Sequence, residues 1–292
     1  MKEPLPNFDK LWDYNDPTAT REKFLEILPL AESSGDSVYH QELLTQIART
    51  HGLESDFSSA HAVLDDVERS LADVGPSVRV RYLLERGRAF NSGKRPVDSA
   101  PLFTEAWDLA RKHALHGYAV DAAHMLGIVE DGDKSLHWNE EAMRYAEHCG
   151  DERAARWLGA LYNNIGWTYH EMERYEEALT LWRKGLAFHE ERKSSTRPLY
   201  IARWTIGRGL RSLGRAEEAL EEQRKLRLAY EESPIEDMGF VAEEIGECLH
   251  ALGRAEEARP FFAEAYGKLS QIGWVAEEKE RIERLRQLSQ PQ

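Results

Sequence analysis

The residue types best suited to chemistry in this 292-residue chain are eleven histidines and two cysteines. His113 and His116 stand three residues apart, which places two imidazoles on one side of a helix and could hold a metal ion weakly. No neighbouring cysteine or carboxylate supplies a third ligand. His148 and Cys149 are adjacent, so on a helix they point in different directions. The chain also lacks a His-Glu-x-x-His pair and a Gly-rich phosphate loop. We therefore expect no metal, no cofactor and no catalytic residue.

The elements that must position any functional side chain follow from a regular spacing of small residues. These stand 39, 40, 39, 41 and 39 residues apart, at Ala48, Gly87, Gly127, Gly166, Gly207 and Gly246. Twelve residues after each comes a residue that is usually small: Ala60, Ser99, Asn139, Ala178, Ala219 and Ala258. Four further on comes a larger one: Leu64, Phe103, Met143, Trp182, Gln223 and Phe262. Such a period, with two helical stripes per unit, predicts a stack of helical hairpins.

The packing of each hairpin follows from this register. A Gly or Ala at the register position of the first helix lets the two helices approach closely. We expect the Ala of the second helix to pack against this small residue. Apolar residues three and four apart form the stripe that each hairpin buries. No run alternates apolar and polar residues for long enough to require a sheet. We predict an all-helical chain of about fourteen helices.

The clearest unit resembles the tetratricopeptide repeat (TPR) family, because Tyr162, Ile165, Gly166, Tyr169, Ala178 and Trp182 fill that family's motif positions in order. The resemblance extends over roughly residues 38–290, with a period longer than the usual ~34 residues and without the closing proline. The longer unit is similar to the extended-helix TPRs of bacterial regulators and motor-protein light chains. The resemblance implies an all-α, TPR-type α-solenoid: a right-handed superhelix of about six helical hairpins with terminal capping helices.

The chain divides along these repeats. We expect an N-terminal segment and capping helix in 1–36, six TPR-like repeats in 37–269, and a C-terminal capping helix and tail in 270–292. Asp16 and Pro17 make a good start for the first capping helix. Trp12 is placed to pin the irregular first residues to that helix.

Composition and charge limit the expected binding partners and the cellular compartment. The net charge of −14 leaves no excess of Lys and Arg to displace phosphate counterions. This argues against non-specific binding to nucleic acid. No apolar run suggests a signal peptide or a bilayer span, so we expect no membrane association. Cys149 and Cys248 lie in different repeats, and a disulfide between them is not expected. A reduced, cytoplasmic protein is the simplest interpretation.

The TPR resemblance implies that first helices line a concave groove, and the face opposite their packing stripe supplies the contacts. The candidate partner-binding residues on that face are Arg49, Arg88, His124, Asn163, Asn164, Trp167, His170, Trp204, Arg208 and Arg211. Asn matches a peptide backbone with one donor and one acceptor, Arg grips carboxylates, and Trp offers a flat apolar platform. The alternatives left open are that both Trp pack between neighbouring first helices and that both Asn cap local backbone.

The strongest site prediction concerns two consecutive first helices. We expect Asn163, Asn164, Trp167, Trp204 and Arg208 to lie within one ligand's reach, with Arg49 and Arg88 further along the same wall. Asn164 also occupies the middle position of the carboxylate clamp of chaperone-binding TPRs. The flanking positions hold His124, Ile128, Ile201 and Thr205, so the clamp is incomplete and chaperone tails are not implied.

Arg86 stands where the other repeats carry a large apolar residue. An unpaired buried guanidinium would be strongly unfavourable. We favour a side chain that reaches solvent along its stem, with a buried polar network as the alternative.

Together these features predict a protein- or peptide-binding TPR scaffold or adaptor without catalysis of its own. The alternative is a peptide-responsive regulatory sensor that controls a partner protein in trans. An enzyme is a distant third, since no converging groups are evident. Self-association through an exposed terminal hairpin stays open.

Overall fold

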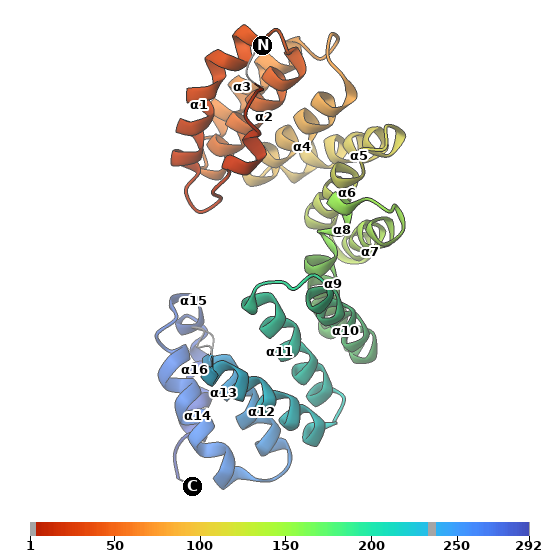
Figure 1. Ribbon diagram of the computed structural model, residues 1–292. Helices are drawn as coiled ribbons and strands as arrows, with labels where there is room; N and C mark the ends of the chain where they lie inside the picture. Colours follow the sequence, from red (N-terminus) through yellow and green to blue (C-terminus); the bar gives the residue numbers. More distant parts are fainter. Residues whose placement is uncertain (1–3, 233–237, 292) are drawn as a thin grey trace. The chain divides into compact units, whose positions relative to one another are not determined.

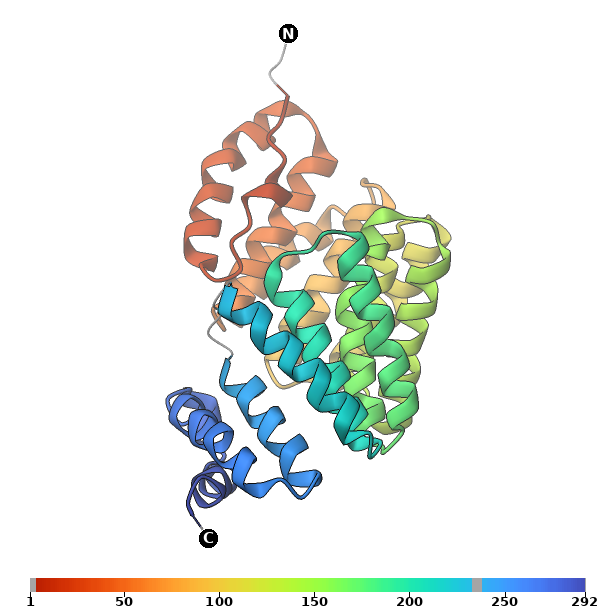
Figure 2. The same ribbon diagram turned by 60° about the horizontal axis from the view of Figure 1, so that its bottom comes forward.

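The computed structural model describes residues 4–232 and 238–291, and within these ranges the chain is helical with no strand. It packs as two compact units, residues 1–157 (unit 1) and 158–292 (unit 2). The prediction of an all-α, TPR-type solenoid is confirmed: antiparallel helix pairs follow one another along the chain (Figures 1 and 2). Within the described ranges, no helix has the length and apolar character that a bilayer span requires.

Unit 1 consists of a short 3-10 turn, a capping helix, three hairpins and a final single turn. Its elements are η1 Phe8–Leu11, α1 Pro17–Ser34, α2 Ser37–Leu53, α3 Phe57–Arg69, α4 Pro76–Ser92, α5 Pro96–Lys112, α6 His116–Val129, α7 Gly132–His148 and α8 Glu152–Ala155. The pairs α2–α3, α4–α5 and α6–α7 are the predicted repeats one to three.

Unit 2 consists of three further hairpins followed by a terminal helix. Its elements are α9 Leu158–Glu171, α10 Tyr175–Glu191, α11 Thr196–Ser212, α12 Ala216–Glu232, α13 Met238–Ala251, α14 Ala255–Leu269, α15 Gly273–Ala276 and α16 Lys279–Leu288. The four-residue helices α8 and α15 were not foreseen. They are single turns that precede α9 and α16, and the remaining α-helices of the described chain match the predicted set.

In four hairpins the close approach has a different partner from the one expected, whereas Gly127 meets Asn139 at the expected position. A Cβ added to Gly166 would overlap the indole of Trp182, and one added to Gly207 would overlap the amide of Gln223. The nearest side chain is thus the large residue at the later position, and Ala178 is buried beside it. A flat group laid over a glycine fills space that an alanine methyl would leave open, which is why the large position tolerates Trp, Phe and Gln.

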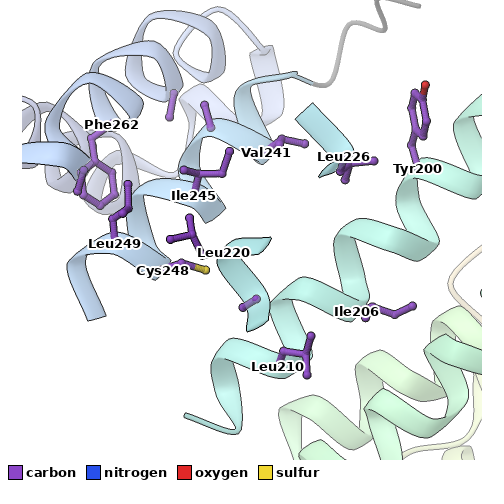
Figure 3. Close-up of a cluster of buried hydrophobic side chains, with 14 of the residues drawn as sticks. Tyr200, Ile206, Leu210, Leu220, Leu226, Val241, Ile245, Cys248, Leu249 and Phe262 are labelled. Carbon is purple, nitrogen blue, oxygen red and sulfur yellow. The ribbon is translucent and has the colours of Figure 1, made fainter. Parts of the chain in front are cut away.

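The core of unit 2 is one cluster of buried side chains from α10 to α16. Figure 3 shows Tyr200, Ile206 and Leu210 of α11 with residues of α12, α13 and α14 in one cluster. Cys248 is buried within it, and both cysteines are free thiols. Burying such apolar surface stabilises the unit by roughly 25 cal/mol per Å².

The N-terminal cap confirms the expected role of Trp12. Asp16 caps α1 by accepting the amide of Ala19, and the indole of Trp12 packs edge-on against Phe24 of α1 with ring centroids 5.3 Å apart. Phe8 is buried against the same ring at 6.3 Å. The irregular first residues are therefore held to α1 by two aromatic anchors.

Arg86 differs from the favoured expectation. Its side chain does not reach solvent along its stem, because the residue is only 6% exposed. The guanidinium forms ion pairs with Asp65 (2.5 Å) and Glu68 (3.4 Å) of α3 and donates to the carbonyl of His61 (3.2 Å). The structure is nearer to the alternative, because the guanidinium is buried and paired, but its carboxylate partners on α3 are each 57% exposed. The repeat register alone did not reveal these counter-charges.

Candidate functional site

The structure divides the ten candidate residues between the two units. Arg49, Arg88 and His124 belong to α2, α4 and α6 of unit 1. In unit 2, α9 carries Asn163, Asn164, Trp167 and His170, and α11 carries Trp204, Arg208 and Arg211. All ten lie on first helices of hairpins, and none is fully buried.

A row of four aromatic rings runs across the alternate helices α9, α11, α13 and α15 of unit 2. Trp167 on α9 lies 5.9 Å from Trp204 on α11, which lies 6.3 Å from Phe240 on α13, which stacks on Trp274 of α15 at 5.9 Å. The indole of Trp204 also donates to the backbone carbonyl of Phe240 (3.1 Å). The alternative that Trp204 packs between neighbouring first helices is therefore correct, and the same packing holds its ring in the row.

This row lines a hollow of about 400 Å³, here called the aromatic groove. Its lining residues are Trp167, Arg197, Ile201, Trp204, Phe240, Val241, Ile272, Trp274 and Arg281. Trp274 is 62% exposed and Ile201 is 40% exposed, so the groove presents large apolar side chains to solvent. Contiguous exposed apolar surface of this kind marks binding sites in soluble proteins.

Phe240 stands on the groove-facing side of the sixth first helix in the repeat register but was not among the ten candidate partner-binding residues, and Trp274 was not a candidate. Trp274 was assigned to the terminal cap because the small-residue register ends before it. The four aromatics nevertheless stand 37, 36 and 34 residues apart. That shrinking period was the signal that could have identified the groove.

Beside the aromatic groove lies a charged hollow of about 510 Å³, whose lining residues are Trp167, Trp204, Arg208, Arg211, Glu243, Glu244, Glu247, Arg281 and Arg284. Here Arg208 and Arg211 both face Glu244, at 3.6 Å and 2.5 Å. Burial raises the pKa of Glu244 to about 7, although Arg211 acts in the opposite sense. These two arginines are thus paired within the chain. An acidic ligand would have to displace the Glu244 carboxylate to bind them.

Asn163 and Asn164 line a separate hollow of about 280 Å³, together with Ala160, Ile201, Thr205 and neighbouring residues of α10 and α11. The amide of Asn163 donates to Oδ1 of Asn164 (3.0 Å). The Oδ1 atom of Asn163 is buried and has no hydrogen-bond partner among the described residues. Ile201 borders both this hollow and the aromatic groove, so the five residues predicted to share one ligand lie around adjoining hollows.

The two candidate histidines have structural partners. His170 lies 2.8 Å from the hydroxyl of Ser212 and packs against Trp167 and Trp182, and burial lowers its pKa below 6.5. His124 lies 3.3 Å from Oδ1 of Asn139 and packs against Trp157 of its own unit. Across the described part of the chain, no three His, Cys, Asp or Glu side chains are grouped as metal ligands.

Arg49 and Arg88 lie in a hollow of about 350 Å³ in unit 1, here called the arginine hollow. Both guanidiniums donate to Glu85, at 3.1 Å and 2.8 Å, and Arg88 also pairs with Asp121. Burial works against the charged form, but Asp121 and Glu85 raise the pKa of Arg88 above its usual value. The full lining is Asp9, Trp12, Tyr14, Gln46, Arg49, Arg81, Leu84, Glu85, Arg88, Gly117, Tyr118, Asp121, Arg153, Arg156 and Trp157.

Comparison with known proteins adds one match by sequence and several by structure. Residues 158–192, which hold α9 and α10, match the family model for the tetratricopeptide repeat. A comparison with curated proteins gives no match. A signal transduction ATPase with numerous domains and a tetratricopeptide repeat sensor, from Pyrococcus horikoshii, shares the fold with a TM-score of 0.75 at 13% identity. That similarity covers 91% of this chain and 42% of the other, so the chain spans less than half the length of that structure.

Two further structures share the fold over most of both chains. The apo form of the quorum sensor NprR from B. thuringiensis has a TM-score of 0.58 at 17% identity, covering 96% of this chain and 79% of that one. The apo form of RapI has a TM-score of 0.58 at 14% identity, covering 85% and 94%. At these identities the likeness shows the fold alone. The matched model shows a tetratricopeptide repeat at residues 158–192, and the shared fold shows that the chain is a TPR-type α-solenoid.

Proposed function

We propose that the chain is a non-catalytic scaffold or adaptor that binds a protein or peptide segment on the first helices of its repeats. The observation that carries the proposal is the aromatic groove of unit 2. Four rings from alternate helices line it, and Trp274 and Ile201 are exposed to solvent within it. Rigid aromatic anchors of this kind supply most of the binding energy at many protein interfaces, because they bury a large area at a small cost in entropy.

The neighbouring hollows suit the rest of a bound segment. Asn163 and Asn164 carry amide groups that match a peptide backbone, and the unpartnered Oδ1 of Asn163 can accept an N–H. Beside the groove, an acidic side chain of the segment could pair with Arg208 and Arg211 in exchange for Glu244. Apolar side chains of the segment would occupy the aromatic groove itself. In this proposal His170 holds Trp167 in place. Arg49, Arg88 and His124 lie in unit 1 and take no part in the aromatic groove.

A peptide-responsive sensor is the second candidate, and one observation favours it. Two of the structures that share the fold are described as sensors: the quorum sensor NprR and the repeat sensor of the P. horikoshii protein. In such a role the bound segment would alter the stacking of hairpins and thereby control a partner protein in trans. Both candidates fit a cytoplasmic protein that binds no nucleic acid, and both leave self-association open.

Selection from a peptide library tests the groove. The full chain is used to select binders, and the enriched peptides are measured against Trp274→Ala and Leu228→Ala variants. Leu228 lies on the second helix α12 and is 63% exposed, so its variant removes a similar exposed apolar group away from the groove. We expect enrichment of apolar side chains and a loss of about tenfold in affinity for Trp274→Ala alone, as for a typical hot-spot residue.

The results separate the alternatives. Equal losses in both variants, or none in either, would remove the aromatic groove as the binding site. Small-angle scattering with and without a selected peptide then distinguishes the two roles. A changed radius of gyration supports the sensor, and an unchanged one supports the adaptor.

A further inference from the structure

An acidic side chain from the N-terminal segment already occupies the arginine hollow of unit 1. Arg81 of α4 donates to both carboxylate oxygens of Asp9, at 3.1 and 3.2 Å. Arg153 of α8 donates to Oδ2 of the same carboxylate at 3.2 Å. Asp9 belongs to η1, far in sequence from both arginines. The carboxylate therefore bridges two guanidiniums that come from different repeats.

The hollow carries more positive than negative charge even with Asp9 in place. Its lining includes five arginines and three carboxylates, in a chain whose net charge is −14. The side chain of Arg156 is 71% exposed, and its ion-pair partner, Glu152, is 3.9 Å away. Arg153 has its ion pair with Asp9. A local positive site in a negative protein attracts a short acidic group while the rest of the surface repels extended polyanions.

The N-terminal segment is anchored by contacts that do not involve Asp9. Phe8 is buried against Phe24 and Tyr39, and the hydroxyl of Tyr39 donates to the carbonyl of Pro6 (2.7 Å). The indole of Trp12 donates to the side chain of Gln46 (3.1 Å). Loss of the Asp9 carboxylate would thus leave the segment in place. Arg81 would keep Glu42, which lies 3.7 Å away, as a counter-charge.

We infer that Asp9 is an intramolecular competitor at a second binding site, which takes an acidic peptide segment. In this proposal a carboxylate of the segment replaces Asp9 between Arg81 and Arg153. Adjacent aromatic surface favours a peptide over a bare anion. Tyr14 is 61% exposed, stacks on Trp12 at 4.7 Å, and has the guanidinium of Arg49 5.7 Å from its ring centre. An apolar side chain next to the acidic one can lie on this ring.

This inference uses residues of unit 1 only, so its success or failure is separate from that of the aromatic groove. The probe is a fluorescently labelled, end-blocked Asp-Leu-Asp-Leu-Asp peptide, and its Asn-for-Asp counterpart is the matched control. Binding to the full chain is followed by anisotropy at low salt. We expect the acidic peptide to bind. Asp9→Asn should raise its affinity about threefold, because a partly exposed ion pair no longer competes.

A second substitution makes the test specific for competition. Arg153→Gln should weaken the acidic peptide, and the loss should be larger in an Asp9→Asn background than in the native chain. The reason is that native Arg153 must first give up Asp9, whereas in the variant it is free to bind the ligand. A general effect of charge would give equal losses in both backgrounds and would overturn the inference.

Asp66→Asn is the matched control for net charge. Asp66 lies on α3, is exposed, and pairs with Arg69 away from the hollow. The inference predicts no tightening from this variant. Equal tightening by Asp66→Asn and Asp9→Asn, or equal binding of the acidic and Asn peptides, would show that Asp9 is not a competitor at a carboxylate site.

Discussion

Gly166 of α9 lies directly beneath the indole ring of Trp182 of α10, so close that a Cβ on the glycine would overlap the ring. The same relationship recurs between Gly87 and Phe103 and between Gly246 and Phe262. Each of these three hairpins is thus closed by a ring laid over a bare backbone. This contact sets the distance between the two helices of the repeat.

Replacing Gly166 with Ala should therefore destabilise the chain, even though Ala is the better helix former. The added methyl must push Trp182, which is 1% exposed, out of its packed position. Overpacking of this kind costs roughly 1–3 kcal/mol. Gly267→Ala in α14 is the control, because a Cβ there meets nothing within 4 Å. Urea unfolding should show a lower free energy of unfolding for Gly166→Ala. For Gly267→Ala it should show an unchanged or slightly higher one. The same free energy of unfolding for both variants would contradict the packing described here.

The repeat register was predictable because it depends on local spacing. The small residues, the helix pairs and the anchoring by Trp12 all follow from residue types at fixed distances along the chain. The partner of Gly166 was assigned to the wrong position, since sequence spacing does not tell which side chain of the facing helix leans over the glycine.

The candidate site was harder to predict, because it depends on pairing across repeats. Arg49, Arg88 and Arg211 looked available for a ligand, yet Glu85, Asp121 and Glu244 pair with them from the same or the next first helix. Those carboxylates stand on the same helix faces and were visible in the sequence. Which of them an arginine contacts depends on the rotation between successive hairpins, which the register does not specify.

The network around Arg86 gives a second prediction. Arg86→Met should leave stability unchanged or raise it by about 1 kcal/mol, because a buried ion pair often contributes no more than an apolar side chain of similar size. Its carboxylate partners, Asp65 and Glu68, are both more than half exposed and can be solvated when the guanidinium is removed. Removing both carboxylates should be costly instead, since Arg86 is 6% exposed and would lose both of its ion pairs. Thermal melting of Arg86→Met and of the Asp65→Ala/Glu68→Ala double variant measures both effects. A larger loss from Arg86→Met than from the double variant would contradict the prediction.

Glu244 makes the stability of unit 2 depend on pH. Burial raises the pKa of its carboxyl from 4.5 to about 7, and Glu247 and Glu243 add to the effect while Arg211 opposes it. Below pH 4.5 the group is protonated in both the folded and the unfolded chain. Between pH 4.5 and 7 the unfolded chain releases the proton first, so the free energy of unfolding falls as the pH rises. Above pH 7 no further loss follows from this group.

Glu244→Gln isolates that contribution. We subtract the free energy of unfolding of the variant from that of the native chain. This difference should fall by on the order of 1–3 kcal/mol as the pH rises from 4.5 to 7.5. Urea titrations at several pH values measure it, and the subtraction cancels the other titrating groups. A difference that stays constant over this range, or shifts in favour of the native chain, would show that Arg211 holds the carboxyl ionised throughout.

The amide pair on α9 provides a matched test of the hollow next to the aromatic groove. Asn164→Ala removes an exposed amide that bonds Asn163 at 3.0 Å, and Glu221→Ala removes an exposed side chain from the second helix α12. If a bound segment places its backbone over α9, Asn164→Ala should weaken it by about 0.5–1.5 kcal/mol, the usual net value of a hydrogen bond. Glu221→Ala should leave the affinity nearly unchanged. Titration calorimetry with a peptide selected on the full chain measures both variants, after circular dichroism has matched their helix content to that of the parent. Since the two residues stand on opposite helices of neighbouring repeats, equal losses would indicate binding to a different face of unit 2.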